Sequence, residues 1–226
     1  TPTVEVVTQL AAALGIGAHE LFAAIISPAG CHALLVMEDH EASALDSARR
    51  AASSPVDRWV VAASAAHHEA RTADADHVVS LSRSRPSYDP DLVAASLAGE
   101  LRRLGDDVRD RQLGLLFAET SMEMSAVDDP HSILTFEQRW ADVVSEAVAA
   151  VGAHAAWNVC VYDADAVRAL ADPVAGALQL LHSHDTVWTA RGNAVWRGRA
   201  AARRLLRAVR PPHERATSWH ASVEQM

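Results

Sequence analysis

The sequence predicts an α/β fold in which helices flank a parallel β-sheet. Short apolar runs alternate along the chain with longer, alanine-rich segments whose apolar residues recur at helical spacing. The apolar runs lack strict polar alternation, which is typical of strands that are buried on both faces of a parallel sheet. Half of the 226 residues are hydrophobic. This content is sufficient for one main core, so we expect one large domain with small appendages.

Strands and helices are expected in alternation from Cys31 onward. The expected strands are residues 33–37, 59–63, 77–81, 113–118, 156–162 and, less regularly, 186–196. The expected helices are residues 41–53, 66–73, 90–105, 132–150, 164–182 and 198–209. The segment from Arg197 to Arg210, which contains the last of these helices, carries six arginines. We interpret it as a basic amphipathic helix whose basic face is solvated or meets phosphate or an acidic partner.

Charge and composition disfavour several classes of protein. The formal net charge of −9 disfavours general nucleic-acid binding, because neutralising phosphates requires clustered cations. No GxxxxGK[ST] or GxGxxG motif follows the first expected strand, so nucleotide hydrolysis is not expected. The apolar runs are far shorter than the about 18–20 residues that cross a bilayer, and no signal peptide is recognised. Cys31 and Cys160 form no CxxC pair, which fits a reducing, cytoplasmic setting without membrane contact.

Ligands of parallel α/β sheets bind beyond the carboxyl ends of the strands, so the candidate site residues are those near these ends. Cys160 and Tyr162 lie two apart on one expected strand and therefore share a face, where the phenol could orient a small organic ligand. The alternative is that Cys160 is a core residue and Tyr162 caps the sheet. The other candidates follow the first and fourth strands: Glu38, Glu119, Met122 and Glu123.

Twelve histidines raise the alternative of a metal site. His32, His182 and His184, together with Cys160 or Cys31, could bind zinc or copper if the fold brought them together. No spacing among them is that of a zinc motif, so no metal cofactor is predicted. Nothing in the sequence near Cys160 marks an activated thiol nucleophile, so we expect no enzymatic activity.

The first residues resemble the last two helices of an XRE (Cro/repressor-type) helix-turn-helix domain. Val4, Leu10 and Leu14 share a helical stripe that ends at Gly15. The matching segments are Pro2-Thr3-Val4-Glu5, Leu10-Ala11-Ala12-Ala13-Leu14-Gly15 and His19-Glu20-Leu21-Phe22. In that family the turn and the recognition helix precede this segment, so DNA contact is expected only through residues upstream of Thr1. The alternative is an amphipathic helix pair that packs on the main domain.

Most of the remaining chain, from about Gly30 to Arg191, resembles the MEDS family of sensory domains found in DcmR-like regulators. The order and spacing of six segments carry the resemblance: Gly30-Cys31-His32-Ala33-Leu34-Leu35, Ser87-Tyr88-Asp89-Pro90-Asp91, residues 115–124 (LLFAETSMEM), Phe136-Glu137-Gln138-Arg139-Trp140, Asn158-Val159-Cys160-Val161-Tyr162-Asp163 and Leu181-His182-Ser183-His184. The fold that this resemblance implies is a RecA/KaiC-like parallel sheet with a degenerate nucleotide site. The resemblance of the first residues adds a short N-terminal helical segment.

Together these interpretations predict three parts: a helical remnant at 1–26, a MEDS-like sensory domain at 27–196, and a basic helix and tail at 197–226. We expect a ligand-sensing domain of a bacterial transcriptional regulator that binds a small, largely apolar molecule and controls a helix-turn-helix. A homodimer is expected, because operators of such regulators are usually two-fold symmetric. Two alternatives stay open: a module that controls a partner such as an anti-sigma factor or kinase, and a metal- or haem-responsive sensor.

Overall fold

The computed structural model describes residues 8–9, 12–13, 31–38, 43–53, 55–63, 75–80, 90–118, 130–189, 191 and 193–210. Most of the predicted N-terminal segment 1–26, the predicted helix 66–73 and the tail after Arg210 lie outside these residues.

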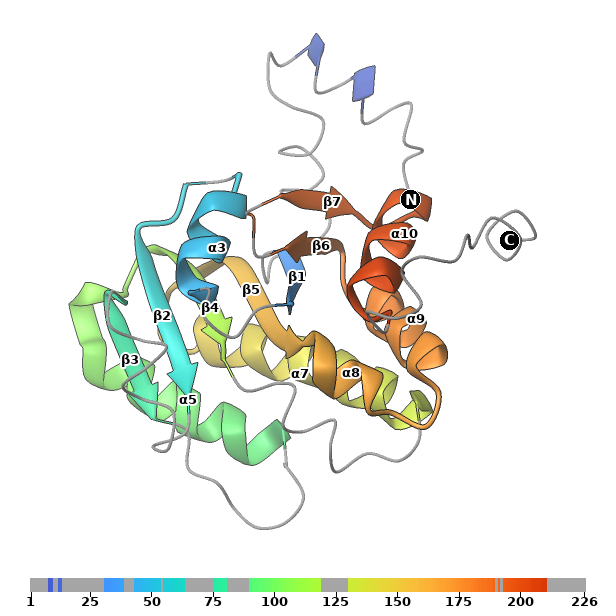
Figure 1. The fold of residues 1–226 in the computed structure, drawn as a ribbon. Coiled ribbons are helices and arrows are strands. Elements are labelled where there is room, and N and C mark those ends of the chain that lie inside the picture. The colour runs from blue at the N-terminus through green and yellow to red at the C-terminus, as the bar shows by residue number, and fades with distance from the viewer. Residues whose placement is uncertain are drawn as a thin grey trace.

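A seven-stranded, mostly parallel sheet forms the centre of the fold (Figure 1). The strand order is β3-β2-β4-β5-β1-β6-β7, and only the last pair, β6 and β7, is antiparallel. The strands are β1 (Cys31–Met37), β2 (Arg58–Ala63), β3 (His77–Ser80), β4 (Gln112–Phe117), β5 (His154–Asp163), β6 (Thr186–Thr189) and β7 (Ala194–Trp196). The predicted α/β class with a parallel sheet is confirmed.

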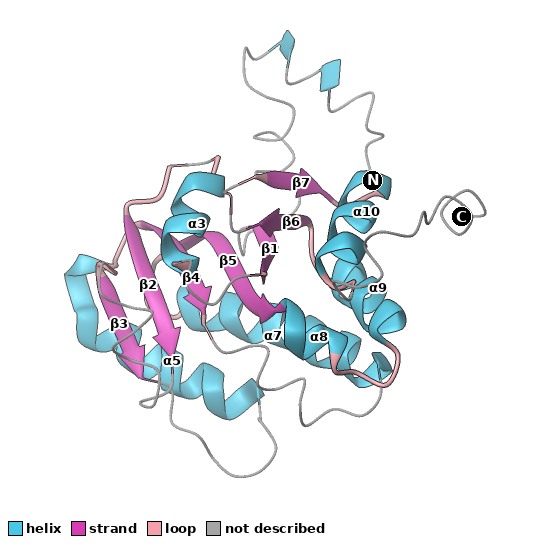
Figure 2. Cartoon of the chain, in the orientation of Figure 1, coloured by secondary structure: helices cyan, strands magenta, loops and turns pink. Residues whose placement is uncertain are grey.

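Helices cover both faces of this sheet (Figure 2). One face packs against α3 (Ala44–Ala51), whose N-terminus is capped by the Ser43 hydroxyl. The other face packs against α5 (Pro90–Leu104), α7 (Pro130–Ala149), α8 (Ala164–Arg168), α9 (Pro173–Ser183) and α10 (Arg199–Ala208). A 3₁₀ turn, η2 (Gly105–Asp107), follows α5.

Side-chain alternation along the central strands separates two apolar cores. On the α3 side, Leu35, Trp157 and Trp188 are fully buried. On the other side, Leu34 and Trp140 belong to the larger core beneath α7. Each central strand therefore contributes apolar side chains to both faces, which explains why the sequence shows apolar runs and no alternation.

Two predicted elements are split in the structure. The predicted helix 164–182 is α8 followed by α9, because the Asp172 carboxylate caps the new helix by accepting from the Ala175 N–H and Pro173 occupies its first turn. The predicted strand 186–196 is the β6–β7 hairpin, in which the chain reverses so that Val187 pairs with Val195. The prediction of one continuous element was wrong in both places.

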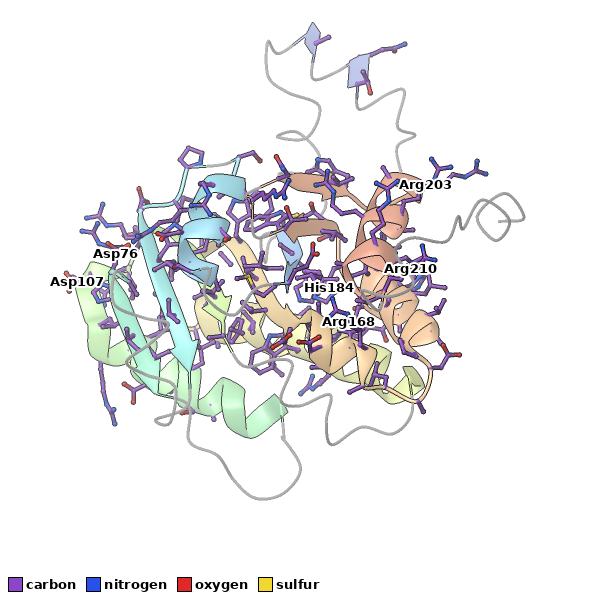
Figure 3. The ribbon with its side chains drawn as sticks, in the orientation of Figure 1. Asp76, Asp107, Arg168, His184, Arg203 and Arg210 are labelled. Carbon is purple, nitrogen blue, oxygen red and sulfur yellow. The ribbon has the colours of Figure 1, made fainter. Side chains whose placement is uncertain are left out.

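Helix α10 is amphipathic as predicted, with Ala201, Leu205 and Ala208 buried against the domain. Arg199, Arg203 and Arg207 are exposed, and Figure 3 shows Arg203 pointing away from the body of the protein. Among the described residues, no helix is both long and apolar enough to cross a membrane.

Candidate functional site

Five polar or reactive side chains meet in the interior between the sheet and α7. This buried cluster consists of His32, Glu137, Cys160, Tyr162 and His184. Its members come from β1, α7, β5 and the residue after α9, so distant parts of the chain build it. The side chains are nearly inaccessible to solvent, with relative exposures of 6% for His32 and 0–1% for the other four residues. Figure 3 labels His184 in this interior region.

Strand register brings three members of the cluster to one face. His32 pairs with Asn158 across β1 and β5, and Cys160 and Tyr162 follow at alternate positions of β5. Because alternate residues of a strand point to the same side, all three side chains face α7. Cys31 points to the opposite face and belongs to the α3-side core.

Glu137 is the acidic member of the cluster and lies in α7. Residues 140, 144 and 148 form the buried stripe of this helix, and Glu137 continues that stripe one turn earlier. Its Oε1 accepts a hydrogen bond from the Tyr162 hydroxyl, and its Oε2 accepts one from the Cys160 thiol at 3.5 Å. Oε2 also lies 3.5 Å from Nε2 of both His32 and His184.

Backbone carbonyls fix the orientation of both imidazole rings. His32 Nδ1 lies 3.0 Å from the Ser183 carbonyl oxygen, and His184 Nδ1 lies 2.7 Å from the Leu180 carbonyl oxygen. A carbonyl oxygen only accepts, so each Nδ1 carries the proton and each neutral ring directs its Nε2 lone pair into the cluster. The two rings lie side by side, with centroids 4.0 Å apart.

Burial controls the protonation of the cluster. It lowers the pKa of His32 to about 4 and lowers the pKa of His184 well below its ordinary value. It raises the pKa of the Glu137 carboxyl to about 7, against the opposing effect of the hydrogen bonds that this group accepts. Since both imidazoles are neutral at neutral pH, their 3.5 Å contacts with Glu137 are contacts between a lone pair and a carboxyl group and not ion pairs.

The cluster contains fewer hydrogen-bond donors than acceptors. The Cys160 thiol has one proton and two acceptors within reach, Glu137 Oε2 at 3.5 Å and His32 Nε2 at 3.3 Å from the sulfur. His184 Nε2 has no hydrogen-bond partner among the described residues, although it is completely buried. When the Glu137 carboxyl is ionised, this nitrogen has no donor among the described residues, although Glu137 Oε2 lies 3.5 Å away. A buried acceptor without a donor costs about 1–3 kcal/mol, so an occupant that accepts its electron pair would be stabilised here.

The sequence identified part of this cluster. Of the residues predicted to bind ligand, Cys160 and Tyr162 belong to it, Glu38 is exposed just after β1, and Glu119, Met122 and Glu123 lie outside the described residues. Of the residues named as alternative metal ligands, His32, Cys160 and His184 meet in the cluster. His182 is exposed and Cys31 faces the other core, so these two are not part of the set.

Two contributors to the cluster were not predicted from the sequence. Glu137 was noted only as part of the family-like segment, although a carboxylate on the buried stripe of α7 was a readable signal. Asp185 was also missed: its carboxylate accepts from the His32 backbone N–H at 3.0 Å, and its own N–H donates to the His32 carbonyl at 2.8 Å. These bonds hold the turn after α9 against β1 and so position His184.

Comparison with known proteins adds no family to this description: no family model, no curated protein and no solved structure matches the chain.

Proposed function

We propose that this chain is a ligand-sensing, non-catalytic domain of a transcriptional regulator, and that its ligand is held by the buried cluster. The observation that carries the proposal is that five polar or reactive groups, including an unpartnered imidazole nitrogen, meet inside an otherwise apolar core. Burying such groups is costly, and apolar side chains of similar volume usually stabilise a fold at least as well. Ligand binding therefore explains the presence of these residues better than a contribution to folding does.

The position of the cluster supports a sensing role. Glu137 belongs to α7, whereas His32, Cys160 and Tyr162 belong to the sheet and His184 follows α9. An occupant that contacts all of these groups would favour one packing of α7 and α9 on the sheet. It would shift the equilibrium between two arrangements by its difference in affinity for them.

Burial of the cluster supports a non-catalytic role. Cys160 and His32 lie close enough for a thiol–imidazole nucleophile pair, with 3.3 Å between sulfur and nitrogen. A substrate, however, needs access to the sulfur, and Cys160 is 0% exposed. An occupant of this interior is small and polar, which differs from the largely apolar molecule expected from the sequence. The expected apolar ligand stays a prediction, because three of its six predicted contacts lie outside the described residues.

The finer features of the fold belong to the same proposal. We infer a RecA/KaiC-like sheet with a degenerate nucleotide site, as the sequence resemblance implies. In support, β1 is an interior strand, and the segment from Glu38 to the start of α3 contains no phosphate-binding glycine motif. Control of a helix-turn-helix, a cytoplasmic location and a homodimer are parts of this proposal that rest on the sequence.

Native mass spectrometry, compared with the same sample denatured, tests whether the cluster is occupied. We expect an additional mass in the native protein that is absent after denaturation and absent from the His184→Asn variant. The matched control is His182→Asn, which changes an exposed histidine two residues away and should retain the mass.

Hydrogen exchange tests the sensing part of the proposal. Backbone amides of α7 and α9 are expected to exchange more slowly in the occupied protein than in the stripped protein, because the occupant ties both helices to the sheet. Identical exchange in the two states would contradict sensing through these helices, whatever the occupant is.

A further inference from the structure

We propose that the occupant of the buried cluster is a single divalent d-block cation of the zinc class, bound by His32 Nε2, Cys160 Sγ, His184 Nε2 and Glu137 Oε2. This inference shares one assumption with the proposed function, namely that the ligand is held by the buried cluster. These four donor atoms all lie within 4.8 Å of one another, and all four side chains are buried.

The separations between donor atoms are close to those of a four-coordinate site. Bond lengths of about 2.0–2.3 Å in a tetrahedral zinc site place neighbouring donor atoms roughly 3.3–3.7 Å apart. Here His32 Nε2 is 3.3 Å from the sulfur and 3.5 Å from Glu137 Oε2, and His184 Nε2 is 3.5 Å from the same oxygen. The sulfur lies 3.5 Å from Glu137 Oε2. The two remaining pairs join His184 Nε2 to the sulfur and to His32 Nε2, and they need only contract from at most 4.8 Å.

The orientation of the rings is the one that metal-bound histidines usually have. A ligating imidazole commonly donates its second N–H to a carbonyl or carboxylate, which fixes the ring and its tautomer. Both His32 and His184 do this through Nδ1, to the carbonyls of Ser183 and Leu180. The Tyr162 hydroxyl orients the Glu137 carboxylate in the same way, because it donates a hydrogen bond to Oε1. Oε2 is then the carboxylate oxygen that binds the metal.

Charge balance favours a divalent ion. Cys160 binds a metal as the thiolate and Glu137 as the carboxylate, so the ligand set carries two negative charges beside two neutral imidazoles. A divalent cation makes the complex neutral, which is the favoured state in an interior where charge is costly. Binding releases the thiol proton, and also the carboxyl proton when Glu137 is protonated.

The chemical types of the donors select the class of metal. Imidazole nitrogen and thiolate sulfur bind zinc and copper, whereas Mg²⁺ and Ca²⁺ prefer sites built only of oxygen. The nearby carboxylate oxygen supplies a fourth strong donor for a tetrahedral ion. Two axial imidazoles of a haem lie on opposite faces of the macrocycle, but here the ring centroids are 4.0 Å apart and both Nε2 atoms lie 3.5 Å from the same Glu137 oxygen, which leaves no room for a macrocycle between them.

Titration with Co²⁺ followed by Zn²⁺ tests the assignment directly. The protein is stripped with a chelator under reducing conditions and its metal content is measured before and after loading. We expect one Co²⁺ per chain, with the intense visible bands of four-coordinate cobalt and a near-ultraviolet thiolate-to-cobalt band. One equivalent of Zn²⁺ should abolish this spectrum, because zinc binds more tightly than cobalt at such sites.

Variants assign the ligands. Cys160→Ser should remove the thiolate-to-cobalt band, and His184→Asn and Glu137→Gln should weaken Zn²⁺ binding more than Tyr162→Phe does. We expect a loss of about 10–100-fold for Tyr162→Phe, because this residue only orients a ligand. His182→Asn is the matched control and should bind Zn²⁺ as the unmodified protein does. If circular dichroism shows that His184→Asn does not fold, Cys160→Ser provides the test, because it replaces only the sulfur atom by oxygen.

Three outcomes would overturn the assignment. These are cobalt binding without the thiolate band, Zn²⁺ affinity that is unchanged in Cys160→Ser, and tight Cu⁺ binding that is indifferent to Glu137→Gln while Zn²⁺ does not bind. An organic mass in the native spectrum would refute the metal but leave the sensing proposal standing. Zn²⁺ binding that leaves exchange in α7 and α9 unchanged would confirm the metal and refute the sensing proposal, since the metal would then not alter how these helices pack on the sheet.

Discussion

Trp188→Ala should lower the free energy of unfolding by about 3–5 kcal/mol, the usual cost of removing a fully buried aromatic side chain. Trp188 is 0% exposed, lies opposite Leu35 across β6 and β1, and packs edge-on against Trp157 with ring centroids 4.8 Å apart. Alanine would leave a cavity between the sheet and α3. Denaturation in urea, followed by circular dichroism, measures the change.

Two further variants make this prediction specific. Trp196→Ala removes the same side chain from the edge strand β7, where it is 36% exposed, and should change the free energy of unfolding much less. Trp188→Phe keeps an aromatic ring and removes an indole N–H that has no hydrogen-bond partner among the described residues, so it should cost less than alanine. Equal losses for Trp188→Ala and Trp196→Ala would contradict the packing described above.

Gly114→Ala should destabilise the protein by about 1–3 kcal/mol, the usual cost of overpacking a core. Gly114 lies opposite Trp59 across β4 and β2, and a Cβ at this position would lie 2.6–2.8 Å from three carbon atoms of the Trp59 ring. Trp59 is 5% exposed, so its ring has little freedom to move away. The same denaturation experiment measures this loss.

Gly99 provides the matched control for this substitution. It lies within α5, and a Cβ there would meet no heavy atom within 4 Å. Gly99→Ala is therefore expected to stabilise the protein by about 0.5–1 kcal/mol, because alanine favours the helix over the unfolded chain. Gly114→Ala can also be made in a Trp59→Leu background. If it lowers the free energy of unfolding there as much as in the unmodified protein, the Trp59 ring is not the cause of the loss.

The sheet was predictable because local patterns determine it. Residues 33–37 and 113–118 are apolar runs between helical segments, and β1 and β4 match them within two residues. The β6–β7 hairpin was not predicted because the run from Thr186 to Trp196 is apolar at both ends, although Gly192-Asn193 between the two strands is a turn signal. The break before α9 was missed although Asp172-Pro173 is a helix-start signal.

The cluster was only partly predictable because its contacts are far apart in the sequence. The period of two along a strand was sufficient to place Cys160 and Tyr162 on one face. It did not show which helix covers that face, and Glu137 lies 25 residues before Tyr162. Nor did the sequence decide between Cys31 and Cys160 as the sulfur ligand of the alternative metal set, because that choice depends on which side of the sheet faces α7.

The antiparallel strand β7 has a consequence for how copies of this chain could associate. It contains three residues and ends one edge of the sheet, so it offers few free backbone groups to a strand of a second molecule. The next element along the chain is the arginine-rich α10. Its exposed arginines would repel the same arginines of a second copy placed against it. At this edge the fold resists joining two sheets into one, so the predicted homodimer would have to form through a different surface.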